Sequence, residues 1–239
     1  MGAVKKNDIK PWLKKQWCLA TIDSQFIALM EDLLDLYEKP YNCRYPVVGV
    51  DERPCQLLGD ILLPLPVQPG SVKKEDYHYK RNGICTVFVA VEPLNGFRIL
   101  WVRHRRTKRD YALFMELLAR AYPEAEKICL VQDNLNTHKI GSFYETFPAQ
   151  KARELVERFE FHYTPKKASW LNMAEIELSV LSKQCLDRRI SSTKEMTKQV
   201  AAFEKKRNMM KATITWCFTT AKARGKMDTH YHNIRRNYN

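Results

Sequence analysis

The sequence lacks the features that place a chain in a membrane or in an oxidising compartment. No run of about 18 consecutive apolar residues is present to span a bilayer, and the opening residues, MGAVKKNDIKPW, contain no apolar signal-peptide core. The seven cysteines are odd in number and never spaced as C-x-x-C, which indicates neither a disulfide framework nor a zinc ribbon. We therefore expect a soluble, intracellular protein with reduced and mostly buried cysteines.

The chain also has only eight glycines, no internal repeat and no segment of low complexity. By contrast, 45% of its 239 residues are hydrophobic, which is enough to bury a substantial core and makes disorder unexpected. Lys and Arg outnumber Asp and Glu by 40 to 27, for a formal net charge of +13. This excess favours a polyanionic partner, either nucleic acid or an anionic membrane surface, but no basic amphipathic anchor supports the membrane.

The order of the expected elements predicts an α/β fold. Apolar residues recur at helical spacing over 23–37 and 110–122, and a further helical stretch covers 150–158. Five apolar or alternating runs are typical of strands: 47–50, 84–93, 96–104, 127–133 and 159–165. A PLNG turn joins the second and third runs, which predicts that they pair antiparallel. This order predicts a mixed sheet covered by helices, with residues 58–82 mostly in loop and residues 192–224 helical and basic.

Two of the expected strands lead directly into aspartates. The run VVGV ends at Asp51, and ICLVQ ends at Asp133. Ligands of open α/β sheets bind at the carboxyl ends of strands, where these side chains are expected. Two carboxylates about 4 Å apart repel by roughly 4 kcal/mol at an effective dielectric near 20, a cost that a divalent cation such as Mg²⁺ or a shared proton must relieve. Either aspartate alone could equally be a turn residue or a helix N-cap.

A third carboxylate follows in the segment YTPKKASWLNMAEIELSVLSKQCLDRR. Asn172 is a plausible N-cap, and Glu175 three residues later fits a capping box, which is a purely structural interpretation. Glu177 is an equal candidate on periodicity, because the two glutamates flank opposite edges of the stripe formed by Leu178, Leu181 and Cys185. The residue pattern leaves this choice open.

Four segments occur in an order that is specific when taken together: PVVGVDERPCQL, DYHYKRNGICTVFVAVEPLNGFR, LVQDNLNTHK and FHYTPKKASWLNMAEIELSVLSKQCL. Over nearly the whole chain, the sequence resembles the catalytic domain of DDE transposases of bacterial insertion sequences, in the mariner-related branch called the IS six-thirty family. The resemblance implies a ribonuclease H-like mixed sheet flanked by helices, with a basic helical C-terminal extension. It places Asp51 on the first strand and Asp133 after the fourth, and its Asn-x-x-Glu signature falls on Asn172 and Glu175, with Glu177 in reserve.

The resemblance also implies a chemistry and a set of partners. Two Mg²⁺ ions, for which Mn²⁺ can substitute, are expected between Asp51 as the bridging ligand and Asp133 and Glu175 as ligands of one ion each. Water attack would free a 3′-hydroxyl at the element end, and that hydroxyl would attack target DNA without a covalent enzyme intermediate. The expected partners are the terminal inverted repeats, target DNA and a second copy of the chain, and the expected location is the bacterial cytoplasm, at the nucleoid when DNA is bound.

Several further residues are candidates for DNA contact or support. In the run RHRRTKRD, Arg103, Arg105 and Arg106 are candidates for contact with DNA phosphates. The alternative is that this run is a solvated surface with no DNA contact. Lys166 and Lys167 lie closer in sequence to the chemistry, and Trp170 could stack on a base or belong to the core. Asn134 and His138, with Asn172, are expected to support the site, although a turn or a loop hydrogen bond would explain the first two. A metal pair at His230 and His232 has no further ligands nearby.

Two features depart from the family pattern. The 42 positions from Asp133 to Glu175 exceed the spacing in eukaryotic mariner relatives, and the helical stretch over 147–158 is the expected extra material. Only about 45 residues precede Asp51, too few for two DNA-reading helical units. We therefore expect a helical lead-in at 1–45, a catalytic domain at 46–190 and a basic helical extension at 191–239 packing on the core or a partner. The alternative function is a non-catalytic DNA-binding remnant.

Overall fold

A computed structural model describes residues 22–236 of the chain, so residues 1–21 of the expected lead-in at 1–45 lie outside the described part. Helix α1 (Ser24–Glu38) forms where the periodicity predicts it. Asp23 caps it by accepting a hydrogen bond from the backbone N–H of Phe26 at 2.7 Å. Within the described residues, no helix is both long and apolar enough to cross a membrane.

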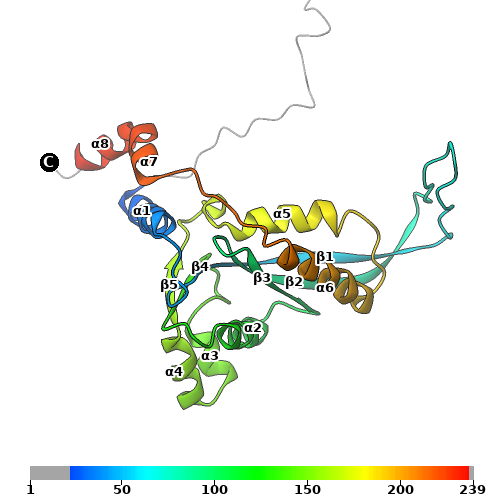
Figure 1. The fold of residues 1–239 in the computed structure, drawn as a ribbon, viewed down its shortest axis with the longest axis horizontal. Coiled ribbons are helices and arrows are strands. Elements are labelled where there is room, and N and C mark those ends of the chain that lie inside the picture. The colour runs from blue at the N-terminus through cyan, green and yellow to red at the C-terminus, as the bar shows by residue number, and fades with distance from the viewer. Residues whose placement is uncertain (1–21, 237–239) are drawn as a thin grey trace, which may run out of the picture.

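Five strands form one mixed sheet, as predicted (Figure 1). Their order is β3-β2-β1-β4-β5, with β1 antiparallel to β2, β2 antiparallel to β3, and both β1–β4 and β4–β5 parallel. The strands are β1 (Val47–Asp60), β2 (Tyr79–Glu92), β3 (Phe97–Arg103), β4 (Ile128–Gln132) and β5 (Phe159–Tyr163).

The prediction that the first strand ends at Asp51 is wrong. Strand β1 continues to Asp60, and Asp51 and Glu52 pair within it opposite Val89 and Phe88 of β2. The reason is non-local, because β2 supplies backbone hydrogen bonds to residues whose own polarity suggests a loop. The predicted loop is therefore shorter and covers residues 61–78 at the tip of an arm that projects beyond the sheet (Figure 1). Leu63 at this tip is 92% exposed.

The helices cover the two faces of the sheet in separate groups (Figure 1). On one face, Phe114 of α2 (Lys108–Ala121), Phe143 of α3 (Gly141–Thr146) and Ala152 of α4 (Ala149–Glu157) pack in one core with alternate residues of the central strands. On the other face, α5 (Ala174–Gln184) and α6 (Thr193–Met209) pack over β1 to β3, and α1 packs over β4. This alternation along the strands buries both faces of the sheet.

The C-terminal part is less helical than predicted. Helix α6 ends at Met209, and residues 212–219 are neither helix nor strand before α7 (Thr220–Lys226) and α8 (Asp228–Arg236). The segment TITWCFTT is rich in β-branched and aromatic residues, which are weak helix formers. It is held instead by tertiary contacts, since Ile214 donates its backbone N–H to Pro93 O at 2.9 Å and Trp216 packs against Tyr37 of α1 at a centroid distance of 5.2 Å.

A buried ion cluster ties α5 and α6 to the sheet. Arg98 of β3 and Glu177 of α5 are both fully buried, with Arg98 Nε 3.0 Å from Glu177 Oε1. Arg207 of α6 donates to the same carboxylate from Nε at 3.0 Å and from Nη2 at 2.8 Å. The other Arg98 nitrogens donate to backbone carbonyls, including Gly96 O at 2.8 Å. Glu177 therefore has a structural task.

We expect Glu177→Gln to lower the free energy of unfolding by about 3–5 kcal/mol, because it leaves Arg98 charged and buried with its carboxylate partner removed. Urea unfolding followed by circular dichroism would measure the loss. Glu175→Gln, on the same helix, is the matched control and should leave stability within about 0.5 kcal/mol of the parent chain. Equal stability of the two variants would contradict the structural task of Glu177.

Candidate active site

The parallel pairing of β1 with β4 sets the first two acids side by side. Gly49 pairs with Val131, and the same offset carried two residues further places Asp51 level with Asp133, directly after the last residue of β4. The sequence-based expectation that the two carboxylates are neighbours agrees with this register. Asp51 is half-buried within β1, and Asp133 is half-buried at the start of the loop that follows β4.

Asn172 positions the third acid. Its buried side chain donates from Nδ2 to Val50 O at 2.8 Å and accepts from the backbone N–H of Ala174 at 3.1 Å, which fixes the start of α5 against β1. A Cβ at Gly49 would lie 2.8 Å from Asn172 Oδ1, so this close approach requires glycine. The expected capping box does not form, because the N-cap of α5 is Met173 and makes no side-chain cap hydrogen bond. Glu175 in the first turn is left free for another role.

The structure separates the two glutamates that periodicity could not. Glu175 and Asp51 line one pocket of about 340 Å³, together with Glu52 and Ser182. Glu177 points away into the ion cluster with Arg98 and Arg207. The geometry therefore favours Glu175 as the partner of Asp51, and its catalytic role stays a prediction.

Electrostatic repulsion at the site acts on Asp51. Burial, together with the neighbouring charges of Glu175, Glu52 and Asp133, raises the pKa of Asp51 to about 7, against the lowering effect of the Glu52 backbone N–H. That N–H donates to Asp51 Oδ1 at 2.7 Å. A divalent cation would relieve this repulsion in place of a proton, and an all-carboxylate donor set suits Mg²⁺ or Mn²⁺.

The three acids do not form a closed cluster of ligand atoms in this structure. Among the described residues, the only group of three His, Cys, Asp or Glu side chains with ligand atoms within 4.8 Å of one another is Cys129, Glu160 and His162, which lies elsewhere. At least one pair of ligand atoms among Asp51, Asp133 and Glu175 is therefore separated by more than that limit. The donor set fits divalent cations.

His138 fixes Asp133 from behind. It is 1% exposed, with Nδ1 2.5 Å from Asp133 Oδ1 and Nε2 3.0 Å from Glu52 Oε2. Burial alone would lower the pKa of His138, but its hydrogen bonds and charge interactions with Asp133 and Glu52 raise it to about 9. A positively charged imidazole therefore bridges two carboxylates at neutral pH. Its burial rules out direct contact with DNA and favours the support role among the sequence-based interpretations.

Glu52 is a site residue that sequence reasoning missed. Its side chain is almost fully buried and faces both His138 and Arg106, whose Nη1 lies 3.3 Å from Glu52 Oε1. The sequence does contain a pattern that could have identified Glu52. If β1 is read as continuing past Asp51, the period-two alternation of a strand puts Glu52 on the opposite face, toward α2, where only a paired carboxylate is tolerated.

The predicted DNA-contact residues fall into two groups. Lys166 and Lys167 line a cleft of about 850 Å³ with Asp133 and Asn134, walled on the other side by the start of α1. Trp170 is 48% exposed and meets Phe218 edge-on at 5.8 Å, so the core interpretation of this tryptophan is wrong.

In the second group, Arg103 is the last residue of β3, and Arg105 and Arg106 lie on the loop toward α2. Arg103 Nε donates to Asp110 at 2.9 Å, and its guanidinium stacks on Trp101 at 4.6 Å. Arg106 pairs with Glu52, as described above, and Arg105 is exposed. Arg103 and Arg106 thus have intramolecular partners, which the sequence did not indicate. Both side chains still keep more than a third of their surface exposed.

The raised pKa of Asp51 predicts a pH-dependent response to metal. The stability that protonated Asp51 provides is fully present below its ordinary pKa of 3.8 and is lost as pH rises through about 7. We expect Mg²⁺ to raise the melting temperature more above about pH 8 than below about pH 6, because binding requires the deprotonated form. Asp51→Asn should lose this gain and, without Mg²⁺, exceed the parent chain in stability at the higher pH. An equal Mg²⁺ effect at both pH values would contradict the assignment.

Comparisons with known proteins support the fold. The family model described as DDE superfamily endonuclease matches residues 46–197. No curated protein matches the sequence.

Three solved structures share the fold. The Mos1 mariner paired end complex with Mn is 14% identical with a TM-score of 0.54, over 89% of this chain and 62% of that chain. The Mos1 transposase paired-end complex with left transposon end is 13% identical with a TM-score of 0.53, over 88% and 69%. A pre-cleavage Mos1 transpososome is 13% identical with a TM-score of 0.54, over 87% and 67%.

These likenesses confirm the ribonuclease H-like mixed sheet flanked by helices that the sequence predicted. The chain spans less than two thirds of the length of the first of these structures. The family match covers well over half of the 239 residues, with Asp51, Asp133 and Glu175 inside it. The chain belongs to the DDE superfamily endonuclease family.

Proposed function

We propose that this chain is the catalytic domain of a transposase that cleaves and joins DNA at the ends of an insertion sequence of the IS six-thirty family. One observation carries the proposal. Asp51 of β1, Asp133 after β4 and Glu175 in the first turn of α5 converge on one region, where their mutual repulsion contributes to the raised pKa of Asp51. Such convergence of three carboxylates is costly unless it serves to hold cations.

The three acids would hold the metal ions in this mechanism. Asp51, Asp133 and Glu175 would be the ligands of two Mg²⁺ or Mn²⁺ ions. When bound, the ions supply an activated oxygen nucleophile and stabilise the leaving 3′-oxygen. His138 keeps Asp133 oriented through the 2.5 Å contact, and Asn172 keeps Glu175 beside β1. No covalent enzyme intermediate is needed, so the cysteines and serines have no nucleophilic role.

DNA is the proposed substrate. The cleft beside Asp133 carries Lys166 and Lys167, whose charge suits phosphates, and the half-exposed Trp170 lies three residues beyond them. One solved structure of similar fold is a paired-end complex of the Mos1 transposase with a transposon end. For this chain we propose terminal inverted repeats and target DNA as ligands, a homodimer as the active form on DNA, and action in the bacterial cytoplasm at the nucleoid.

We also propose the domain division that the sequence led us to expect. A catalytic unit spans 46–190, and α6, α7 and α8 within 191–239 form a basic extension. Helix α6 packs on the sheet core through Met196, Val200 and Phe203. Helix α7 packs against α1, where Arg224 Nε donates to Glu31 at 2.8 Å. These contacts support packing on the core as the task of the extension.

Cleavage and strand transfer on a duplex carrying the element end, with Mg²⁺ or Mn²⁺ against EDTA, test the function. We expect metal-dependent products that fall by about a thousandfold or more in Asp133→Asn and Glu175→Gln, because each change removes one cation ligand. Asp187→Asn, which alters an exposed acid outside the site, is the matched control and should retain full activity.

The outcomes separate the assignments. Loss of activity in Glu175→Gln with unchanged stability supports Glu175 as the third acid. DNA binding by the intact chain without product in either metal would instead favour the alternative of a non-catalytic DNA-binding remnant. Products that persist in Asp133→Asn would overturn the proposed mechanism.

The cleft lysines give a separate prediction for DNA binding. We expect Lys166→Gln combined with Lys167→Asn to weaken the salt dependence of DNA binding. The slope of the logarithm of the DNA-binding constant against the logarithm of salt concentration should become less steep by about two, because each lysine that contacts a phosphate contributes about 0.9. Asparagine suits position 167, whose φ is 64°. Fluorescence anisotropy with labelled duplex would measure the slope. Lys194→Gln with Lys198→Gln on exposed positions of α6 is the control, and an equal change in both double variants would contradict a specific role for the cleft.

A further inference from the structure

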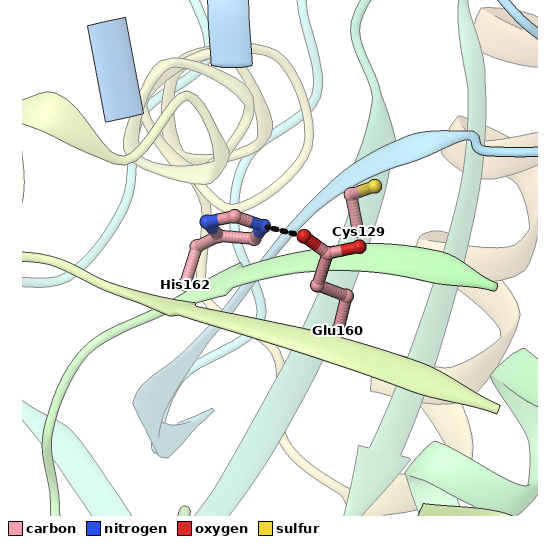
Figure 2. A group of neighbouring side chains, drawn as sticks. All are labelled: Cys129, Glu160 and His162. Atoms are coloured by element: carbon pink, nitrogen blue, oxygen red, sulfur yellow. Dashed lines mark ion pairs between the residues drawn. The ribbon is translucent and has the colours of Figure 1, made fainter. Parts of the chain in front are cut away.

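A second cluster of metal-ligating side chains lies on β4 and β5, on the sheet face that α1 covers (Figure 2). Cys129 of β4 pairs directly with Glu160 of β5, and His162 follows two residues later on the same face. One ligand atom from each of these residues lies within 4.8 Å of the other two. None of the three belongs to the carboxylate site around Asp51.

His162 is prepared to act as a ligand. It is 8% exposed, and its Nδ1 lies 2.7 Å from Asp32 Oδ2 of α1. With the proton on Nδ1 donated to Asp32, the lone pair of Nε2 is available on the other side of the ring. Nε2 is buried without a hydrogen-bond partner and lies 3.4 Å from Glu160 Oε1 (Figure 2). A carboxylate that orients a histidine in this way is the usual outer partner of a metal-bound imidazole.

The other two ligands combine burial with access. Cys129 is buried, whereas Glu160 is exposed and free to adjust its torsions. Both line a pocket of about 390 Å³ that also includes Lys39 and Tyr41. This pocket gives an entry route and room for a water molecule as a fourth ligand. A hydrogen-bonded structural cluster would use His162 and Asp32 but has no need of Cys129 or of an unpartnered Nε2.

We propose that Cys129, Glu160 and His162 form a binding site for a borderline-soft divalent cation, best matched by Zn²⁺, separate from the carboxylate site of the transposase reaction. Ligand bonds of about 2.0–2.3 Å place tetrahedral ligand atoms about 3.3–3.7 Å apart, and the ligand atoms of the three residues already lie within 4.8 Å of one another. The thiolate selects against Mg²⁺, which prefers oxygen. The Cys129 thiol releases its proton to solvent on binding.

The site would link three elements of the fold. The cation joins β4 to β5 directly and α1 through the contact between His162 and Asp32. The N-terminal turns of α1, including Gln25 and Phe26, form one wall of the cleft that contains Asp133 and Lys166. Occupancy would therefore hold the position of that wall without touching the reacting groups.

Titration with Co²⁺ in excess Mg²⁺ tests the proposal on the intact chain. Mg²⁺ occupies the carboxylate site, and a cobalt–thiolate charge-transfer band reports only on a cysteine ligand. We expect a band that saturates at one equivalent, is displaced by Zn²⁺ and disappears in Cys129→Ser. Glu160→Gln, at an exposed position that does not endanger folding, should weaken binding by about tenfold or more, and Asp32→Asn by about 10–100-fold.

Cys217→Ser, which changes an exposed cysteine, is the control and should keep the full band. Absence of a thiolate band in the folded parent chain would overturn the proposal. A band that survives Cys129→Ser, or unchanged affinity in Glu160→Gln, would overturn it as well. None of these readouts depends on DNA cleavage, so the proposal stands or falls independently of the proposed function.

Discussion

The short parallel ladder between β1 and β4 is the constraint on which the candidate active site depends. It sets Asp51 level with Asp133, and a slip of one residue would turn every side chain of one strand to the opposite face. The start of α5 is fixed to the same ladder, since Asn172 bonds to Val50 O and rests on Gly49, where no larger residue fits. The position of Glu175 thus depends on the backbone pairing of β1 with β4 and on the buried side-chain amide of Asn172, which attaches α5 to β1.

The site also shows how a chain with a net charge of +13 tolerates a concentration of acids. Several carboxylates near Asp51 are paired with positively charged side chains. Asp133 and Glu52 share the charged imidazole of His138, and Glu52 also faces Arg106. Glu177 is neutralised by two arginines behind the site. For Asp51, burial and the neighbouring carboxylates raise the pKa to about 7.

The sequence was sufficient for features that depend on local pattern. Periodicity predicted α1 and α2, and turn chemistry predicted the β2–β3 hairpin. The apolar runs that lead into Asp51 and Asp133 predicted neighbouring carboxylates, although only Asp133 follows the end of a strand. It failed where distant segments decide the outcome. The length of β1 depends on pairing with β2, and the burial of Glu52 and His138 depends on packing that brings α2 and the loop after β4 together. Cys129 lies far in sequence from Glu160 and His162, so only the β4–β5 pairing reveals that cluster.

The contact between α1 and α7 has a consequence for the biosynthesis of the protein. Glu31 of α1 receives Arg224 from a position 193 residues later, and Thr220 donates to Glu38 across a similar separation. Helix α1 therefore leaves the ribosome long before its partner is made, at a synthesis rate of about 5–20 residues per second. The contact of α1 with α7 cannot form before α7 has been synthesised, so the helix that walls the cleft gains this support only after all five strands of the sheet have been made.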